Sequence, residues 1–254
     1  MSRLDEIVAE QNAMSRSQAR SLIMEGRVLV DGNPATKPGT NVRANAIIEI
    51  ERPRRYVSRG GEKLDHALNE FDISVLGMSA LDIGASTGGF TDCLLQRGAA
   101  HVVAVDVGYG QLDWGLRNDP RIKVMERTNF RNLSDDAFAE PFDLVVIDAS
   151  FISLRTIVAR AVHFLADGGT IVALVKPQFE AGPQRLGRGG VVRDPAVHRA
   201  VLRETRDALG EIGLKATALV ASPLRGPAGN REFFMRLMRT GTNITNERID
   251  EVVA

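Results

Sequence analysis

The sequence predicts an α/β fold with an open, mostly parallel sheet, preceded by a small α+β unit. From residue 80 onward, short apolar runs of strand length alternate with helical segments. Continuous apolar runs are typical of parallel strands that are covered by helices on both faces. We expect these strands at residues 80–83, 102–105, 122–125, 144–147 and 170–175, with two late strands at 216–220 and 232–238.

Residues 1–51 are predicted to form the small unit. Apolar side chains in residues 4–8 follow a helical period, and a second helix begins near Ser15, where Ser15-Arg-Ser-Gln18 fits a capping box. Strands are expected at residues 28–30 and 47–50. Residues 52–61 are rich in Pro, Gly and Arg, which indicates an interdomain linker before a larger domain at 62–254.

The composition limits the classes of protein to consider. Lys and Arg together number 32, as do Asp and Glu, so any nucleic-acid binding must come from local basic clusters. One cysteine, Cys93, excludes an internal disulfide and a cysteine-based zinc site. There is no apolar run long enough to cross a bilayer, and the N-terminus lacks a signal-peptide core. We therefore expect a cytoplasmic protein that needs no membrane and no metal.

A glycine-rich turn follows the first strand of the predicted sheet, where residues 81–92 read LDIGASTGGFTD. Gly84 permits a sharp turn, and Gly88 and Gly89 allow a ligand or the helix to approach closely. Asp106 ends the next strand, where a carboxylate can accept hydrogen bonds from two ribose hydroxyls. These features predict a nucleotide-type cofactor site, with a plain α/β turn as the alternative.

The turn by itself leaves NAD and S-adenosylmethionine open as cofactors. The nicotinamide fingerprint requires a second glycine where Ser86 stands. The string is instead similar to the first motif of class I methyltransferases.

Four charged residues flank the predicted strands and the first helix of the larger domain. Asp148 and Lys176 each end a strand, Glu232 begins a late strand, and Lys63 stands at the start of the helix after the linker. Each alone has an ordinary explanation as a turn cap, a solvated strand end or a surface charge. At the carboxyl ends of adjacent parallel strands, however, such side chains point into the crevice where ligands bind.

In order and context, these four residues match the Lys-Asp-Lys-Glu tetrad of FtsJ-like 2′-O-methyltransferases. The neighbouring strings are more similar still to the TlyA family of ribosomal RNA 2′-O-methyltransferases, also called hemolysin A. Those strings are SRGGEKL (58–64), DVGYGQL (106–112), RTN (127–129), KPQFE (176–180) and GGVVR (189–193). The resemblance spans nearly the whole chain, except for the residues after Arg239.

The N-terminal unit resembles a small RNA-binding fold named after a small-subunit ribosomal protein and also found in pseudouridine synthases. The matching residues are Arg3-Leu-Asp5, Ser15-Arg16, Ala19, Leu22-Ile23, Gly26, Val28, Val30 and Gly32. TlyA proteins carry this module, so the two resemblances support each other.

The resemblance implies a class I (Rossmann-like) methyltransferase domain that uses S-adenosylmethionine to methylate a ribose 2′-hydroxyl, at cytidine, in ribosomal RNA or ribosomal subunits. It implies a catalytic role for Lys63, Asp148, Lys176 and Glu232. The residues expected to bind the cofactor are Asp82, Gly84, Ser86, Gly88, Gly89, Phe90, Asp106, Asn129 and Asp148. Basic residues expected to bind RNA are Arg3, Arg16, Arg20, Arg27, Arg55, Arg59 and Arg188. We expect a monomer, since RNA would occupy much of the basic surface.

The expected chemistry suits these residue types. Methyl transfer from a sulfonium to a ribose oxygen requires the protein to orient the hydroxyl and help to remove its proton. Lys176 could serve as that base when its amine is neutral. Methylation of an exocyclic amine fits less well, because it typically uses an aromatic residue after prolines, and Asp148 is followed by Ala-Ser-Phe. Methylation of carbon 5 of cytosine also fits less well. It needs a thiolate nucleophile, whereas Cys93 faces the predicted core.

Three other functions are alternatives to an RNA ribose methyltransferase. The sheet could serve a small-molecule or NAD-dependent enzyme, although the tetrad and the RNA-binding module argue against it. The name hemolysin suggests a pore-forming protein, although the sequence offers no spanning segment. The chain could also be an RNA-binding protein whose methyltransferase fold is catalytically silent.

Overall fold

The structure is a computed structural model that describes residues 2–24, 26–43, 45–50, 55–150 and 152–254. Contacts within the chain divide it into two units, Met1–Arg54 and Arg55–Ala254. The boundary falls inside the segment 52–61 that the sequence predicts as a linker, and residues 51–54 lie outside the described residues.

The described residues of the first unit form two helices and two small sheets. The helices are α1 (Leu4–Gln11) and α2 (Arg16–Met24), and the strands are β1 (Ser2–Arg3), β2 (Val28–Val30), β3 (Asn33–Ala35), β4 (Asn41–Val42) and β5 (Ile48–Ile50). β2 lies between β3 and β5, and β1 pairs with β4. The predicted capping box is confirmed, because the Ser15 N–H donates to Gln18 Oε1 and the Gln18 N–H donates to Ser15 Oγ, at 2.9 and 3.2 Å.

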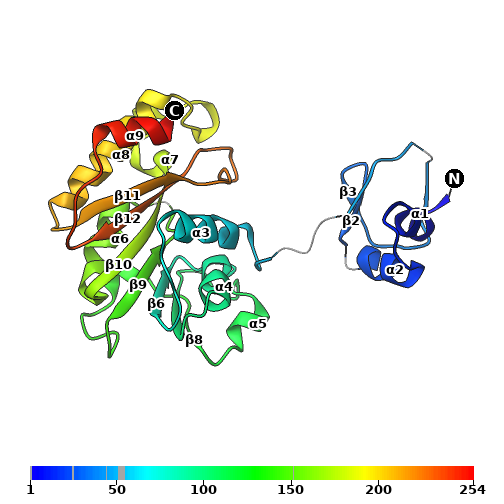
Figure 1. Cartoon of the computed structure of the whole chain (residues 1–254), viewed down its shortest axis with the longest axis horizontal. Coiled ribbons are helices and arrows are strands. Elements are labelled where there is room, and N and C mark those ends of the chain that lie inside the picture. Colours follow the sequence, from blue (N-terminus) through cyan, green and yellow to red (C-terminus); the bar gives the residue numbers. More distant parts are fainter. Residues whose placement is uncertain (1, 25, 44, 51–54, 151) are drawn as a thin grey trace. The chain divides into compact units, whose positions relative to one another are not determined.

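A seven-stranded sheet forms the centre of the second unit, in the order β11-β12-β10-β9-β6-β7-β8 (Figure 1). Its strands are β6 (Ser79–Ile83), β7 (His101–Val105), β8 (Ile122–Met125), β9 (Phe142–Ile147), β10 (Leu165–Val175), β11 (Lys215–Ala221) and β12 (Phe233–Met238). β8, β7, β6, β9 and β10 are parallel, whereas β12 runs antiparallel to both β10 and β11. The predicted α/β class and all seven predicted strands are confirmed.

Helices cover both faces of this sheet. The α-helices are α3 (Arg59–Glu70), α4 (Gly89–Gln96), α5 (Trp114–Arg117), α6 (Leu154–Ala161), α7 (Pro177–Glu180), α8 (Pro195–Gly210) and α9 (Asn246–Val253). Short 3₁₀ turns are η1 (Phe130–Asn132), η2 (Val162–Phe164), η3 (Pro183–Arg185) and η4 (Arg188–Gly190). One buried apolar cluster joins the sheet to α6, α8 and α9, and a second joins it to α3 and α4. In the described part of the chain, no helix has the length and apolar character needed to span a membrane.

Helix α3 begins three residues before the predicted start at Glu62. The Tyr56 ring is buried and packs on Gly61, where an added Cβ would lie 2.2 Å from the ring. The segment before α3 is also held by α4, because Asp92 accepts the Val57 N–H at 2.8 Å and Gln96 donates to the Arg55 carbonyl at 2.8 Å. Gly61, in the first turn of α3, therefore permits the close packing of Tyr56.

Candidate active site

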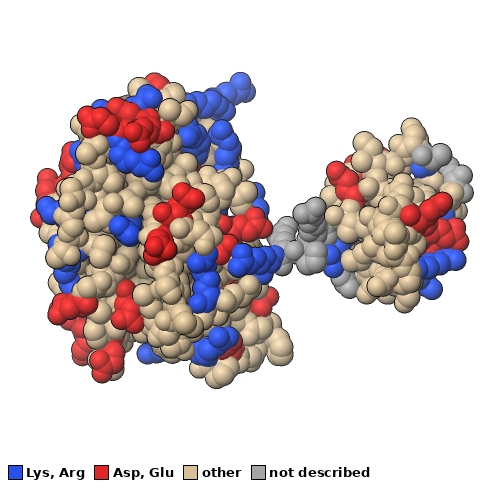
Figure 2. All heavy atoms as spheres, in the orientation of Figure 1, with Lys and Arg blue, Asp and Glu red and all other residues tan. Residues whose placement is uncertain are grey.

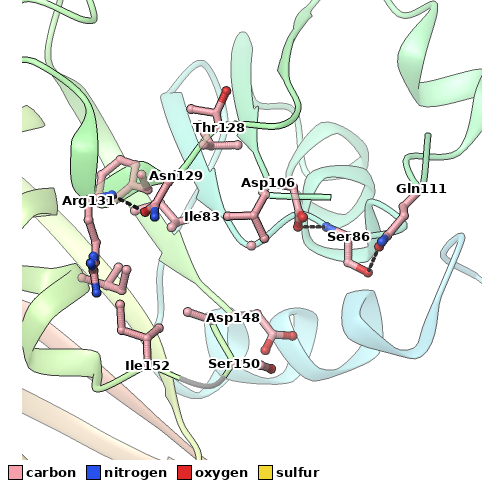
Figure 3. A pocket seen from close by; sticks show the side chains of 16 residues that line it. Ile83, Ser86, Asp106, Gln111, Thr128, Asn129, Arg131, Asp148, Ser150 and Ile152 are labelled. Atoms are coloured by element: carbon pink, nitrogen blue, oxygen red, sulfur yellow. Dashed lines mark hydrogen bonds between the residues drawn. The ribbon is translucent and has the colours of Figure 1, made fainter. Parts of the chain in front are cut away.

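A cavity of about 610 Å³ lies at the carboxyl edge of the parallel strands (Figure 3). The glycine-rich turn follows β6, Asp106 follows β7 and Asp148 follows β9. Five of the residues predicted to bind the cofactor line this cavity, namely Gly84, Ser86, Asp106, Asn129 and Asp148. The volume lies in the range that is typical of small-molecule sites.

Asp106 is fixed so that its carboxylate can receive a further ligand. Its two oxygens accept the N–H of Ser86 at 2.8 Å and the N–H of Gly108 at 2.6 Å. A carboxylate has about four acceptor positions, so both oxygens can still accept hydroxyl donors. This arrangement fits the two hydroxyls of a nucleoside ribose.

Gly84 must be a glycine for two reasons. Its φ is +88°, and a Cβ at this position would lie 2.5 Å from the carbonyl oxygen of Asp148. In addition, the Asp148 N–H donates to the Ile83 carbonyl at 3.0 Å. The turn is thus pressed against the segment that carries Asp148, and the missing side chain permits this close approach.

Asp82 lies behind the turn and is fully buried. One carboxylate oxygen accepts the Thr91 hydroxyl at 2.6 Å, and the other has no hydrogen-bond partner among the described residues. Burial raises the pKa of Asp82 to about 7, although the Thr91 hydroxyl acts in the opposite direction. Its bond to Thr91 joins the end of β6 to the start of α4, so Asp82 supports the glycine-rich turn from behind.

The four predicted tetrad residues form two ion pairs. Lys176 Nζ lies 2.5 Å from Asp148 Oδ1, and Lys63 Nζ donates to Glu232 Oε2 at 2.6 Å. Lys63 and Glu232 are buried, with side chains 9% and 1% exposed.

The sheet brings the two ion pairs together. β9, β10 and β12 are neighbours, and Val175 is paired with Phe233. Lys176 and Glu232 therefore occupy the next positions on adjacent strands, and Lys176 contacts Asp148 after β9. Two amines and two carboxylates thus meet beside the cavity.

The other predicted cofactor residues lie behind the cavity wall rather than on it. Asp82, Gly88, Gly89 and Phe90 are absent from its lining. A Cβ at Gly88 would lie 2.4 Å from Leu116, and one at Gly89 would lie 2.2 Å from Ser58 Oγ, so both glycines permit close packing of α4. The buried Phe90 ring lies 6.0 Å from that of Phe234.

Sequence reasoning missed several residues of the cavity. Ser150, Gln111, Thr128 and Ile152 line it, and none was predicted as a site residue. The Lys176 amine donates to Ser150 Oγ at 2.9 Å. The one available signal was the position of Ser150, two residues after Asp148 at the end of a buried strand.

Cys93 is fully buried on α4, as the sequence predicts. Burial raises the pKa of its thiol to about 12, so the sulfur stays protonated near neutral pH. It is therefore unsuited to attack a base as a thiolate. Among the described residues, no cluster of His, Cys, Asp or Glu could hold a metal ion.

Three of the predicted RNA-binding arginines surround one buried carboxylate in the first unit. Arg3, Arg16 and Arg20 lie 3.0, 3.2 and 3.9 Å from Asp5, whose side chain is fully buried. Hydrogen bonding from Arg3 is the main cause that lowers the pKa of Asp5 to about 2. The three arginine side chains remain 42–58% exposed and so can contact a ligand.

The remaining predicted RNA-binding arginines differ in their surroundings. Arg27 is partly buried and interacts with other residues of the chain. Arg55 forms an ion pair with Asp65 at 2.8 Å. Arg59 and Arg188 are exposed. On the face shown in Figure 2, basic and acidic side chains are interspersed rather than separated. This agrees with the zero net charge of the sequence.

The fold and the site together define a Rossmann-like methyltransferase that uses S-adenosylmethionine. In this class an antiparallel strand, here β12, is inserted near one edge of a parallel sheet. The glycine-rich turn after β6 lies opposite the acidic end of the next strand, Asp106. The comparison with protein families agrees, because the FtsJ-like methyltransferase family matches residues 56–239 and the S4 domain matches residues 2–48. The cofactor is therefore S-adenosylmethionine rather than NAD.

Full-length relatives define the family more narrowly. The chain is 52% identical to the 16S/23S rRNA (cytidine-2′-O)-methyltransferase TlyA of Mycobacterium tuberculosis, over 94% of this chain and 89% of the relative. It is 40% identical to Hemolysin A of Brachyspira hyodysenteriae, over 91% and 97%. A solved structure of a candidate hemolysin from Streptococcus thermophilus matches with a TM-score of 0.78 at 42% identity, covering 99% of this chain and 94% of that chain. The chain belongs to the TlyA family of FtsJ-like methyltransferases.

Proposed function

We propose that this protein transfers a methyl group from S-adenosylmethionine to the ribose 2′-hydroxyl of cytidine in ribosomal RNA. The observation that carries the proposal is the meeting of the Lys176–Asp148 and Lys63–Glu232 ion pairs beside the cofactor cavity. The relative from M. tuberculosis is named for 2′-O-methylation of cytidine in ribosomal RNA, which supports the same acceptor here.

The cavity residues have distinct proposed roles in holding the cofactor. Asp106 accepts the hydroxyls of its ribose, Gly84 and Ser86 form the turn beside it, and Asp82 supports that turn from behind the cavity wall. When bound, S-adenosylmethionine would supply a methyl group attached to a sulfonium sulfur, which is a good leaving group because it departs as a neutral thioether.

Lys176 is the proposed base. A ribose hydroxyl is a weak acid, so a neutral amine at hydrogen-bond distance assists its loss of a proton. Asp148 holds the amine in place through its contact at 2.5 Å. The Lys63–Glu232 pair places a second amine next to this site. Both side chains are buried, so the attraction between the ammonium and the carboxylate holds them in position.

The first unit is proposed to bind the RNA. Asp5 holds Arg3, Arg16 and Arg20 in one cluster, so their guanidinium groups can contact phosphates without each having to be ordered first. Arg27, Arg55, Arg59 and Arg188 are proposed as further RNA contacts. We further propose that the protein acts in the cytoplasm as a monomer, on ribosomal RNA or ribosomal subunits, without a metal or a membrane.

Transfer of a tritiated methyl group from S-adenosylmethionine to ribosomal subunits tests the proposal, with subunits taken from cells that lack this protein. The wild type should place label on an alkali-resistant dinucleotide, which is the signature of a methylated ribose 2′-oxygen. Lys176→Ala should lower the rate by about 10²-fold or more, because it removes the base. Lys215→Ala, at an exposed lysine on β11, is the matched control and should retain the wild-type rate.

Two outcomes would contradict the proposal. Label in alkali-labile nucleotides would indicate a base rather than a ribose as the acceptor. A lack of label with any subunit or free ribosomal RNA, despite measured binding of S-adenosylmethionine, would favour a catalytically silent methyltransferase fold.

A further inference from the structure

We propose that Ser150 is a positioning residue that directs the lone pair of Lys176 towards the acceptor hydroxyl. The inference rests on the proposed function, and it assigns a role to a residue outside the tetrad. Ser150 lines the cavity (Figure 3). Its Oγ accepts a hydrogen bond from Lys176 Nζ at 2.9 Å.

The neutral amine of Lys176 has two N–H groups and one lone pair. One N–H donates to Ser150 Oγ at 2.9 Å, which is a hydrogen bond in the structure. The second N–H is attracted to Asp148 Oδ1, an ion-pair partner 2.5 Å away that accepts no hydrogen bond among the described residues. The remaining tetrahedral position then belongs to the lone pair, which is the group that must receive the proton of the ribose hydroxyl.

Asp148 alone cannot fix this orientation. With a single partner, the amine can rotate about its Cε–Nζ bond, so an N–H and the lone pair exchange places. A second acceptor in a different direction removes that freedom and favours the one rotamer in which the lone pair is available.

A second contact keeps the hydroxyl and the amine at a fixed separation. Glu180 on α7, the helix that follows Lys176 directly, accepts the N–H of Leu154 at 2.7 Å and the hydroxyl of Ser153 at 3.1 Å. These residues follow Ser150 on the segment after β9. The segment with the hydroxyl and the segment with the amine are therefore tied together beyond the site itself.

A hydroxyl suits this role better than a charged acceptor would. Ser150 adds direction without adding charge, whereas a second carboxylate at the same place would favour the ammonium form of Lys176, which has no lone pair. The proposal therefore distinguishes three replacements: Thr keeps the hydroxyl, Ala removes it, and Asp replaces it with a charge.

The test is steady-state methyl transfer to ribosomal subunits by the full-length protein, with kcat, the KM for RNA and the Kd for S-adenosylmethionine measured for each variant. Ser150→Ala should lower kcat by about tenfold, the loss expected for one neutral hydrogen bond, and change the KM and Kd by less than about twofold. Ser150→Thr should restore kcat to within about threefold of the wild type, and Ser150→Asp should lower it more than Ser150→Ala does. Ser134→Ala, at an exposed serine before β9, is the background control.

Each result decides the matter. An unchanged Kd with a lowered kcat in Ser150→Ala, restored in Ser150→Thr, supports the positioning role and shows that the cavity has stayed folded. Wild-type kcat in Ser150→Ala, or equal losses in the Ala and Thr variants, overturns the role of Ser150 while the proposed function stands. If the wild type itself fails to label ribose, the proposed function fails and this inference fails with it.

Discussion

Asp82 is a carboxyl group enclosed entirely by protein, and this gives the fold a specific dependence on pH. Its pKa is raised to about 7 by burial, compared with 3.8 for the unfolded chain. Between these values the folded state binds a proton that the unfolded state does not, so the free energy of unfolding decreases as pH rises from about 4 to about 7. The contribution lost is on the order of 4 kcal/mol.

Asp82→Asn is expected to remove this pH dependence, because the amide is neutral throughout and its oxygen can still accept the Thr91 hydroxyl. Urea unfolding between pH 4.5 and pH 8 would measure the difference between the two proteins. Asp167→Asn, at a fully exposed carboxylate, should show the same profile as the wild type. Parallel curves for the wild type and Asp82→Asn would contradict the raised pKa.

Helix α9 lies outside the region that matches the FtsJ-like family, yet it is part of the methyltransferase core. Ile249 and Val253 are buried in the cluster that covers one face of the sheet. Arg231, the neighbour of Glu232, donates to the carbonyls of Val253 and Val252 at 2.8 and 3.3 Å and so satisfies the end of the helix. The segment thus supports the start of β12, which carries part of the site.

Ile249→Ala should lower the free energy of unfolding by about 2–5 kcal/mol, because it leaves a cavity under α9. Glu251→Ala is the matched change on the exposed side of the same helix, where it removes a surface ion pair with Arg248. It should cost less than about 1 kcal/mol. Similar urea midpoints for the two variants would show that α9 does not contribute to the core.

The elements that were predictable from the sequence are those with long apolar runs. All seven strands of the large sheet could be placed, and Asp148 and Lys176 could be assigned to one edge because each follows a buried strand. Helix α9 was not predicted, because it is short and only two of its side chains are buried, although its apolar side chains do share one face. The pairing of each lysine with its carboxylate and the contact with Ser150 depend on loop geometry, which periodicity does not determine.

At the scale of the whole molecule, each unit has its own apolar core. The boundary at residues 54 and 55 leaves Tyr56 with the methyltransferase unit, where its buried ring packs on Gly61 and belongs to the cluster under α3 and α4. We propose that residues 55–61 serve the larger unit, and that the segment linking the two units is shorter than the sequence indicates.

A fragment of residues 55–254 is therefore expected to unfold cooperatively and to bind S-adenosylmethionine with the Kd of the full chain. A fragment of residues 62–254 lacks Tyr56 and the first turn of α3, so it should be less stable by about 3–5 kcal/mol, the cost of emptying a buried aromatic site. The longer fragment should show a KM for ribosomal RNA raised by about tenfold or more, because the arginine cluster around Asp5 is absent. Equal KM values for the fragment and the full chain would instead place RNA recognition within the methyltransferase unit, and equal stability of the two fragments would place the boundary at Glu62.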